Sequence, residues 1–155
     1  MIPASLYKKI QTVLPIACVD LVVKNSQGEF LLGKRENRPA KGQWFLIGGR
    51  IQKGETLKQA ALRKAKEELG IEVVVTKMLG AGETIWNDGP LGVPVHNINV
   101  VFLVKPKKKS QISFDSQHSN ITWFSAEGGS ASGGKKVSPK LHPYVKHFLK
   151  LANQK

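Results

Sequence analysis

The apolar positions of the chain switch between a two-residue spacing, typical of strands, and a spacing of three to four residues, typical of helices. Strand-like spacing covers residues 16–24, 29–34, 44–47, 72–79 (continuing towards Trp86), 97–104 and 121–124. Helical spacing covers residues 5–12, 57–69 and 142–152. This order predicts an α/β protein, a mixed β-sheet between a central and a C-terminal helix, folded as one domain over residues 1–155.

The predicted central helix carries an apolar stripe and paired charges. The stripe consists of Leu57, Ala60, Ala61, Ala65 and Leu69. Arg63 precedes Glu67 by four residues and Lys64 precedes Glu68 by four, so each carboxylate has a cationic neighbour on its own face of the helix. Glu67 and Glu68 lie about 100° apart around the axis, which lets both flank one hard cation.

Glycine residues border this helix at both ends. Gly48, Gly49 and Gly54 predict a loop whose carbonyl groups can point at a ligand, and Gly70 suits a left-handed C-terminal cap. The fixed positions of the whole stretch are Gly49, Glu55, Arg63, Lys64, Ala65, Glu67, Glu68, Gly70 and Ile71. This pattern resembles the signature of the Nudix hydrolases at every fixed position except Lys64, where the signature has a glutamate. The resemblance implies an α/β/α sandwich that hydrolyses a nucleoside diphosphate derivative with Mg²⁺, or with Mn²⁺.

Composition favours an anionic small-molecule substrate. The net charge is +13, and all four arginines (Arg35, Arg38, Arg50 and Arg63) fall within one short segment, where their planar groups suit a diphosphate. The many lysines provide a background potential that attracts anions. No nucleic-acid recognition motif accompanies them, so nucleic acid is an unlikely partner.

Two further features bear on compartment and reactivity. The chain has no apolar run long enough to span a membrane and no signal peptide, which predicts a cytoplasmic protein. Its single cysteine, Cys18, has apolar neighbours, so we expect a buried thiol and not a nucleophile.

A closer resemblance concerns the GDP-mannose mannosyl hydrolase branch of the family. Residues 20–45 and 48–53 are similar to the corresponding runs of that branch, which also lacks the signature glutamate at the position of Lys64. Members of the branch break the bond at the sugar carbon with inversion, using a histidine that directly follows a metal-binding glutamine in a late loop. Gln117 and His118 stand in that position here. Lys64 cannot act as the base, because an ammonium group has no lone pair.

Carried over to this chain, the resemblance implies a set of roles. The metal ligands would be the Gly49 carbonyl, Glu68 and Gln117, with Glu67 as a candidate for a second metal. Arg35 and Arg50 would bind the diphosphate, Asp20 would lie near the sugar, and His118 would deprotonate the attacking water. Candidate catalytic residues are therefore His118, Arg35, Asp20 and Arg63, and candidate substrate-binding residues are Arg35, Arg50, Asp20 and Asn97.

Some positions depart from that branch and keep alternatives open. Glu67 is retained, Asn97 replaces a tyrosine, and Glu83 and Thr84 stand where the branch has a sugar-binding histidine. Three functions are therefore considered: a nucleotide-sugar glycosyl hydrolase, a Nudix diphosphatase that attacks phosphorus, and a basic nucleic-acid-binding module with vestigial activity. The base, the sugar and the oligomeric state, a homodimer included, stay undecided by the sequence.

Overall fold

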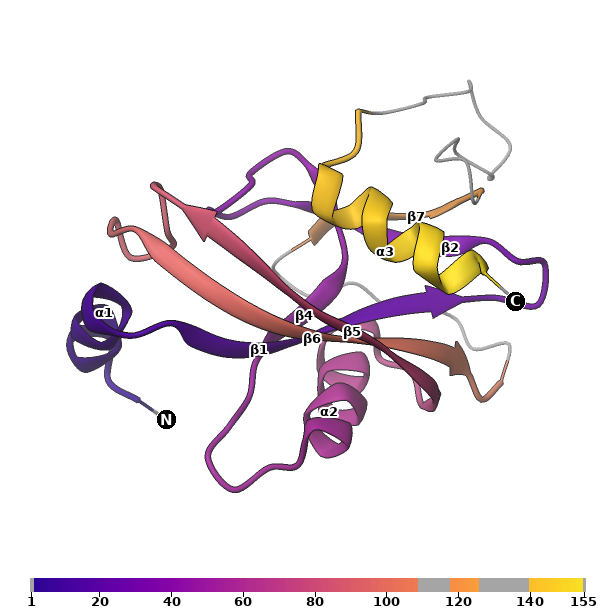
Figure 1. Ribbon diagram of the computed structural model, residues 1–155, viewed down its shortest axis with the longest axis horizontal. Helices are drawn as coiled ribbons and strands as arrows, with labels where there is room; N and C mark the ends of the chain where they lie inside the picture. Colours follow the sequence, from indigo (N-terminus) through magenta and orange to yellow (C-terminus); the bar gives the residue numbers. More distant parts are fainter. Residues whose placement is uncertain (1, 109–117, 126–139, 155) are drawn as a thin grey trace.

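The computed structural model describes residues 2–108, 118–125 and 140–154. In chain order the elements are α1 (Ala4–Val13), β1 (Ile16–Lys24), β2 (Phe30–Arg35), β3 (Trp44–Phe45), β4 (Ile47–Arg50), α2 (Leu57–Leu69), β5 (Val73–Trp86), β6 (Val95–Pro106), β7 (His118–Phe124) and α3 (Pro143–Asn153) (Figure 1). In these ranges no helix is long and apolar enough to cross a membrane.

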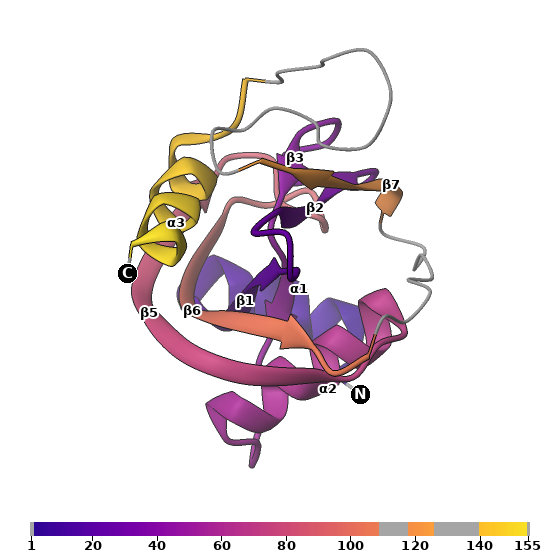
Figure 2. The same cartoon turned by 90° about the vertical axis from the view of Figure 1, so that its right-hand side faces the viewer.

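The strands form one mixed sheet in the order β3-β2-β1-β6-β5. β1 and β6 run parallel, and the other pairs are antiparallel. β2 pairs with β1 only at Val23 and Lys24 and then diverges, so the first half of β1 pairs with β4 instead, and β2 continues alongside β7. The divergence curls the sheet, as Figure 2 shows.

The two faces of the sheet are covered by different helices, as two-residue alternation in the strands requires (Figure 1). Val19, Leu21 and Val23 of β1 pack with α2 in one core cluster. Val22 of β1 and Val101 of β6 pack with α3 in the other. The predicted α/β/α sandwich is therefore confirmed.

The central helix begins and ends through local interactions that its sequence provides. Thr56 and Gln59 form a reciprocal capping box, and Gly70 ends the helix in a left-handed conformation with φ 67°. Four of the five predicted apolar positions are buried, whereas Leu57 is 40% exposed. Leu57 is the first residue of the helix.

The starts of β6 and β7 differ from the sequence prediction, whereas β5 runs on to Trp86 as expected, and Gly48 and Gly49, expected in a loop, lie in β4. β5 extends to Trp86, and β6 begins at Val95 because the two strands pair along their whole length as a long antiparallel ladder. β7 begins at His118 and not at Ile121, because its first residues continue the pairing with β2 as far as Arg35. The prediction of a late loop at His118 is therefore wrong for this residue's backbone.

Candidate active site

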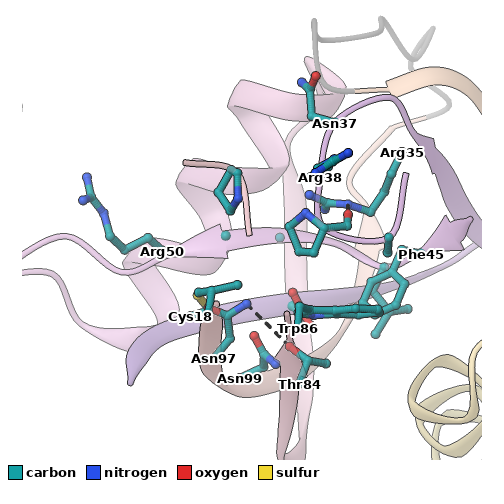
Figure 3. Close-up of a pocket in the computed structure, with 18 of the residues that line it drawn as sticks. Cys18, Arg35, Asn37, Arg38, Phe45, Arg50, Thr84, Trp86, Asn97 and Asn99 are labelled. Carbon is teal, nitrogen blue, oxygen red and sulfur yellow. Dashed lines mark hydrogen bonds between the residues drawn. The ribbon is translucent and has the colours of Figure 1, made fainter. Parts of the chain in front are cut away.

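A cavity of about 720 Å³ opens on the α3 side of the sheet, beyond the end that α3 covers (Figure 3). Its floor comes from alternate residues of three strands: Cys18 and Asp20 of β1, Thr84 and Trp86 of β5, and Asn97 and Asn99 of β6. These residues share a face with Val22 and Val101, which pack under α3. Polar residues thus replace apolar ones where the strands leave the cover of the helix.

The polar floor presents both donors and acceptors to the cavity. Asn97 donates to Thr84 Oγ1 at 3.5 Å, and the two residues are direct partners in the β5–β6 ladder. Asn99 is 4% exposed, and its Nδ2 makes no well-aligned hydrogen bond among the described residues, although its side chain lies near enough to the Tyr144 hydroxyl to oppose the rise in the pKa of that group. A buried amide in this state costs free energy unless a ligand or water accepts from it. The floor is therefore built to bind a polar group.

Asp20 is the buried carboxylate of this floor. Its side chain is 7% exposed, and Tyr144 of α3 donates its hydroxyl to Oδ2 at 2.6 Å. Burial raises the pKa of Asp20 to about 7, while the Tyr144 hydrogen bond opposes this shift. The same burial and the neighbouring carboxylate raise the pKa of Tyr144. Asp20 can therefore change protonation state near neutral pH.

Arginines border the cavity above this floor. Arg35, at the end of β2, donates from Nε to the Pro39 carbonyl at 2.7 Å, which holds the following loop over the cavity. Arg35 and Arg38 lie on the side opposite Asn99 and Thr84 (Figure 3). Arg50 lines the other end of the cavity, and its guanidinium lies 4.6 Å from the centre of the Tyr7 ring.

Aromatic rings form one end of the cavity. Phe45 and Trp86 both line it and meet edge to face, with ring centres 6.0 Å apart. Phe45 also stacks on Tyr144 at 5.6 Å, with an angle of 6° between the rings.

Cys18 is buried on the floor, and burial raises the pKa of its thiol to about 12. The prediction that Cys18 is a buried thiol is confirmed.

The signature helix carries a charged cluster at its edge against β4. Arg63 contacts Glu55, bonds to Glu67 at 2.9 Å and donates to the Arg50 carbonyl at 3.1 Å. The Arg63 guanidinium holds the pKa of Glu55 at about 2. Arg63 thereby fastens the loop before α2 to the helix. It lies outside the cavity lining.

Lys64 occupies the centre of the same cluster. Its Nζ lies 2.5 Å from Oε1 of Glu68 and 3.4 Å from Oε2 of Glu67. The Glu68 side chain is 2% exposed, and that of Glu67 is 47% exposed. The two predicted ion pairs between residues four positions apart, Arg63 with Glu67 and Lys64 with Glu68, therefore form. Both carboxylates also contact one cation, the ammonium of Lys64, whereas the hard cation expected between them stays a prediction.

Consecutive glycines of β4 join this cluster to the cavity. A Cβ on Gly48 would lie 2.2 Å from Oδ1 of Asp20, and a Cβ on Gly49 would lie 3.0 Å from Cε of Lys64. Gly48 tolerates no side chain, because its Cβ would also lie 2.2 Å from the Val19 carbonyl oxygen, whereas a side chain at Gly49 would force the end of the Lys64 side chain to shift. The glycine pair therefore lets Asp20 and the charged cluster approach the same short strand from its two faces.

The donors on α2 suit a hard divalent cation. Glu67 and Glu68 provide carboxylate oxygens, and the Gly49 main chain lies beside Glu68. In the described ranges no group of three or more His, Cys, Asp or Glu residues gathers as a metal site. The carboxylate and carbonyl oxygens suit a cation such as Mg²⁺, which keeps several water ligands and needs few from the protein.

The structure brings some predicted site residues together and separates others. Asp20, Arg35, Arg50, Asn97 and Gly49 all line the cavity. Glu67, Glu68 and Arg63 lie on α2, beyond the glycine pair. Gln117 lies outside the described residues, and His118 is described as backbone, directly paired with Arg35 in the sheet.

Sequence reasoning missed Asn99, Tyr144 and Phe45. Asn97 and Asn99 stand two residues apart in an otherwise apolar strand, and this alternation was the available signal for a polar floor. Tyr144 was identified only as a residue of the apolar face of a helix. Its hydrogen bond to Asp20 spans 124 positions in the sequence and left no local signal.

Comparison with known proteins agrees with this arrangement. The NUDIX domain family model matches residues 14–144. The low-salt glycan biosynthesis protein Agl8 of Haloferax volcanii is 34% identical over 151 residues, covering 96% of this chain and 88% of that protein. An ADP-ribose pyrophosphatase of Methanocaldococcus jannaschii is 37% identical over 90 residues, which are 58% of this chain and 50% of that protein.

A solved structure is similar over nearly the same extent. The MutT protein from Methanosarcina mazei Go1 superimposes with a TM-score of 0.71 at 26% identity, covering 91% of this chain and 95% of that one. The family match spans the strands that build the cavity and the helix with the charged cluster. The chain therefore belongs to the Nudix family and is a Nudix hydrolase.

Proposed function

We propose that this Nudix hydrolase acts on a nucleotide sugar of the GDP-mannose kind. Water adds to the sugar carbon, and the products are a nucleoside diphosphate and a free sugar. The name of the Haloferax relative supports a sugar-linked substrate, since glycans are assembled from activated sugars. The cavity supports it as well, because it combines arginines, a polar floor and an aromatic end.

The observation that carries the proposal is the pairing of His118 with Arg35. This pair follows an irregularity of the β2–β7 ladder between Lys34 and Arg35, and paired residues of antiparallel strands have Cα atoms about 4.5–5.5 Å apart. The backbone of His118 therefore lies beside an arginine whose side chain lines the cavity. Histidine titrates near neutral pH and is a common general base. Lys64, at the signature position of the usual base, is engaged by two carboxylates.

In this proposal the cavity residues divide the binding of the substrate. Arg35 and Arg38 bind the diphosphate, whose negative charge grows as the sugar departs. Asp20 and Asn99 bind sugar hydroxyl groups, the first as an acceptor when ionised and the second as a donor. Phe45 and Trp86 provide a flat apolar surface for a ring. Arg50, stacked on Tyr7 at the end away from the aromatic pair, is the further arginine that can bind the diphosphate.

His118 takes the proton of the attacking water. The water oxygen bonds to the sugar carbon, the bond from that carbon to the phosphate oxygen breaks, and its electron pair goes to the diphosphate. Glu68, the Gly49 carbonyl and Gln117 would hold Mg²⁺ or Mn²⁺, which supplies positive charge for the leaving diphosphate. Attack from the side opposite the leaving group inverts the sugar carbon.

A diphosphatase that attacks phosphorus is the second candidate, and the exposure of Glu67 favours it. That carboxylate is 47% exposed beside Arg63 and Lys64, where it can reach solvent and serve as a base. The pyrophosphatase relative is consistent with this chemistry.

A substrate screen separates the two functions. Purified protein with Mg²⁺ is incubated with GDP-mannose, other nucleotide sugars, ADP-ribose and deoxynucleoside triphosphates, and the products are resolved by ion-exchange chromatography. We expect nucleotide sugars to be the best substrates and to yield nucleoside diphosphate. Preferential release of a nucleoside monophosphate from any of them would favour the diphosphatase.

A further inference from the structure

The ammonium of Lys64 occupies the point at which the two carboxylates of the signature helix converge. It lies 2.5 Å from Glu68 and 3.4 Å from Glu67. The Nudix signature has a glutamate at this position, so the exchange removes a carboxylate and adds an ammonium. The charge of the cluster is thus less negative by two elementary charges than in a chain that follows the signature.

The position of this ammonium is fixed by packing as well as by charge. The Lys64 side chain is 11% exposed, although a free lysine side chain would extend into water. A Cβ on Gly49 would lie 3.0 Å from its Cε and 3.3 Å from its Nζ, so the lysine fills the space between α2 and β4. A buried charge of this kind is tolerated only when it is paired. The pairing with Glu68 is therefore a built part of the site.

We propose that Lys64 is a resident cation that takes the place of a divalent ion at the signature helix. With this ammonium in position, Glu67 and Glu68 hold one divalent ion fewer than they would beside a glutamate at position 64. This inference rests on the proposed function in one respect, the expectation that the site binds Mg²⁺ or Mn²⁺. It makes Lys64 a determinant of how many metal ions the site binds.

The test measures metal binding directly, without turnover. Mn²⁺ is titrated into the protein, and free Mn²⁺ is followed by its electron paramagnetic resonance signal. The variants are Lys64→Glu and, as a matched control, Lys66→Glu, which makes the same charge change at an exposed position two residues further along α2.

We expect Lys64→Glu to bind one more Mn²⁺ than the parent protein, or to bind Mn²⁺ at least about tenfold more tightly, since affinity follows the number of charged ligands. Lys66→Glu should match the parent. Equal changes in the two variants would show a general charge effect and overturn the proposal. Absence of any change in Lys64→Glu would also overturn it.

Thermal unfolding of Lys64→Met gives a second readout if Lys64→Glu fails to fold. In chelator this variant should melt below the parent, because an ion pair of Glu68 is lost. Saturating Mn²⁺ should raise its melting temperature more than that of the parent, since ligands that bind the folded state stabilise it. Equal stabilisation of the two proteins would contradict the proposal. Neither measurement depends on the substrate, so failure of the proposed function would leave both results interpretable.

Discussion

At the scale of single residues, Asp20 combines burial, hydrogen bonding and a place in the cavity. Strand β1 puts its carboxylate on the cavity floor, Gly48 of β4 leaves room for it, and Tyr144 donates to it from α3. Burial in this position raises its pKa to about 7. A carboxylate retained at such a cost in folding free energy is typical of a functional site.

The protonation of Asp20 predicts a pH dependence of stability. Between its ordinary pKa of 3.8 and about 7, the unfolded chain loses this proton while the folded chain keeps it. The folded state then binds more protons than the unfolded state, so the contribution of Asp20 to stability falls as the pH rises through this range. Asp20→Asn lacks this dependence.

Thermal unfolding of the parent and of Asp20→Asn, measured from pH 4 to pH 8, checks this expectation. The melting temperature of the parent should decline relative to the variant as the pH rises. A difference that stays constant across the range would show that Asp20 titrates at its ordinary value.

His118 is the second residue with a specific expectation. If it removes the proton of the attacking water, His118→Gln should lower kcat by roughly 10²–10⁴, the usual size for a general base, with little change in KM. The acid limb of the pH–rate profile should flatten at the same time. His96→Gln, at an exposed pair with Glu83, is a suitable control. Full kcat in His118→Gln would exclude the histidine as the base.

At the scale of elements, the approach of α3 to β5 determines where the cavity begins. Gly82 of β5 allows this approach, because a Cβ there would lie 2.9 Å from ring atoms of both Phe148 and Tyr144. Tyr144 in turn bonds to Asp20. The packing of α3 against β5 therefore places Tyr144 where it can hydrogen-bond to Asp20 in the site.

Substitution of Gly82 tests this packing. Gly82→Ala should lower the free energy of unfolding by about 1–3 kcal/mol, the usual cost of overpacking a core. Phe148→Leu creates space at the same contact, so the double variant should be more stable than the sum of the single effects predicts. Denaturant unfolding of the four proteins measures the coupling. Additive effects would show that the two residues do not share a contact.

Much of this element-level arrangement was readable from the sequence, and the exceptions have physical reasons. Periodicity predicted α2 and α3, and Gly70 predicted the end of α2, since these features depend on nearby residues. The start of β7 at His118 was not predicted, because it depends on pairing with Arg35, far away in the chain. Lys64 was recognised as a departure from the signature. Its contact with both carboxylates required the geometry of β4 and α2 together.

At the scale of the whole molecule, the net charge of +13 acts over distance on anionic substrates. The end of β6 carries Lys105, and Lys107 and Lys108 come directly after the strand. Its start carries Asn97 and Asn99. Six residues of strand separate Asn99 from Lys105, roughly 20 Å at the usual rise. That distance exceeds the screening length of about 8–10 Å at physiological salt. These lysines can therefore steer a substrate only weakly.

Exchange of Lys105, Lys107, Lys108 and Lys109 for serine tests this weak steering. We expect an unchanged kcat and a modest reduction of kcat/KM at low salt, which disappears as the salt concentration rises. Steady-state kinetics at several ionic strengths provides the measurement. A large loss of kcat would contradict the steering role. Tight binding to nucleic acid with a steep salt dependence would instead support the binding-module alternative.

Hydrolysis of a nucleotide sugar in ¹⁸O-labelled water tests the central proposal most directly, because the label marks the atom that water attacks. Mass spectrometry of the products locates the label, and NMR identifies the first sugar anomer formed. If water adds to the sugar carbon, the label appears in the free sugar, the anomer is inverted, and the nucleoside diphosphate is unlabelled. Label in a phosphate group, with release of a nucleoside monophosphate, would contradict the proposal and assign the reaction to phosphorus.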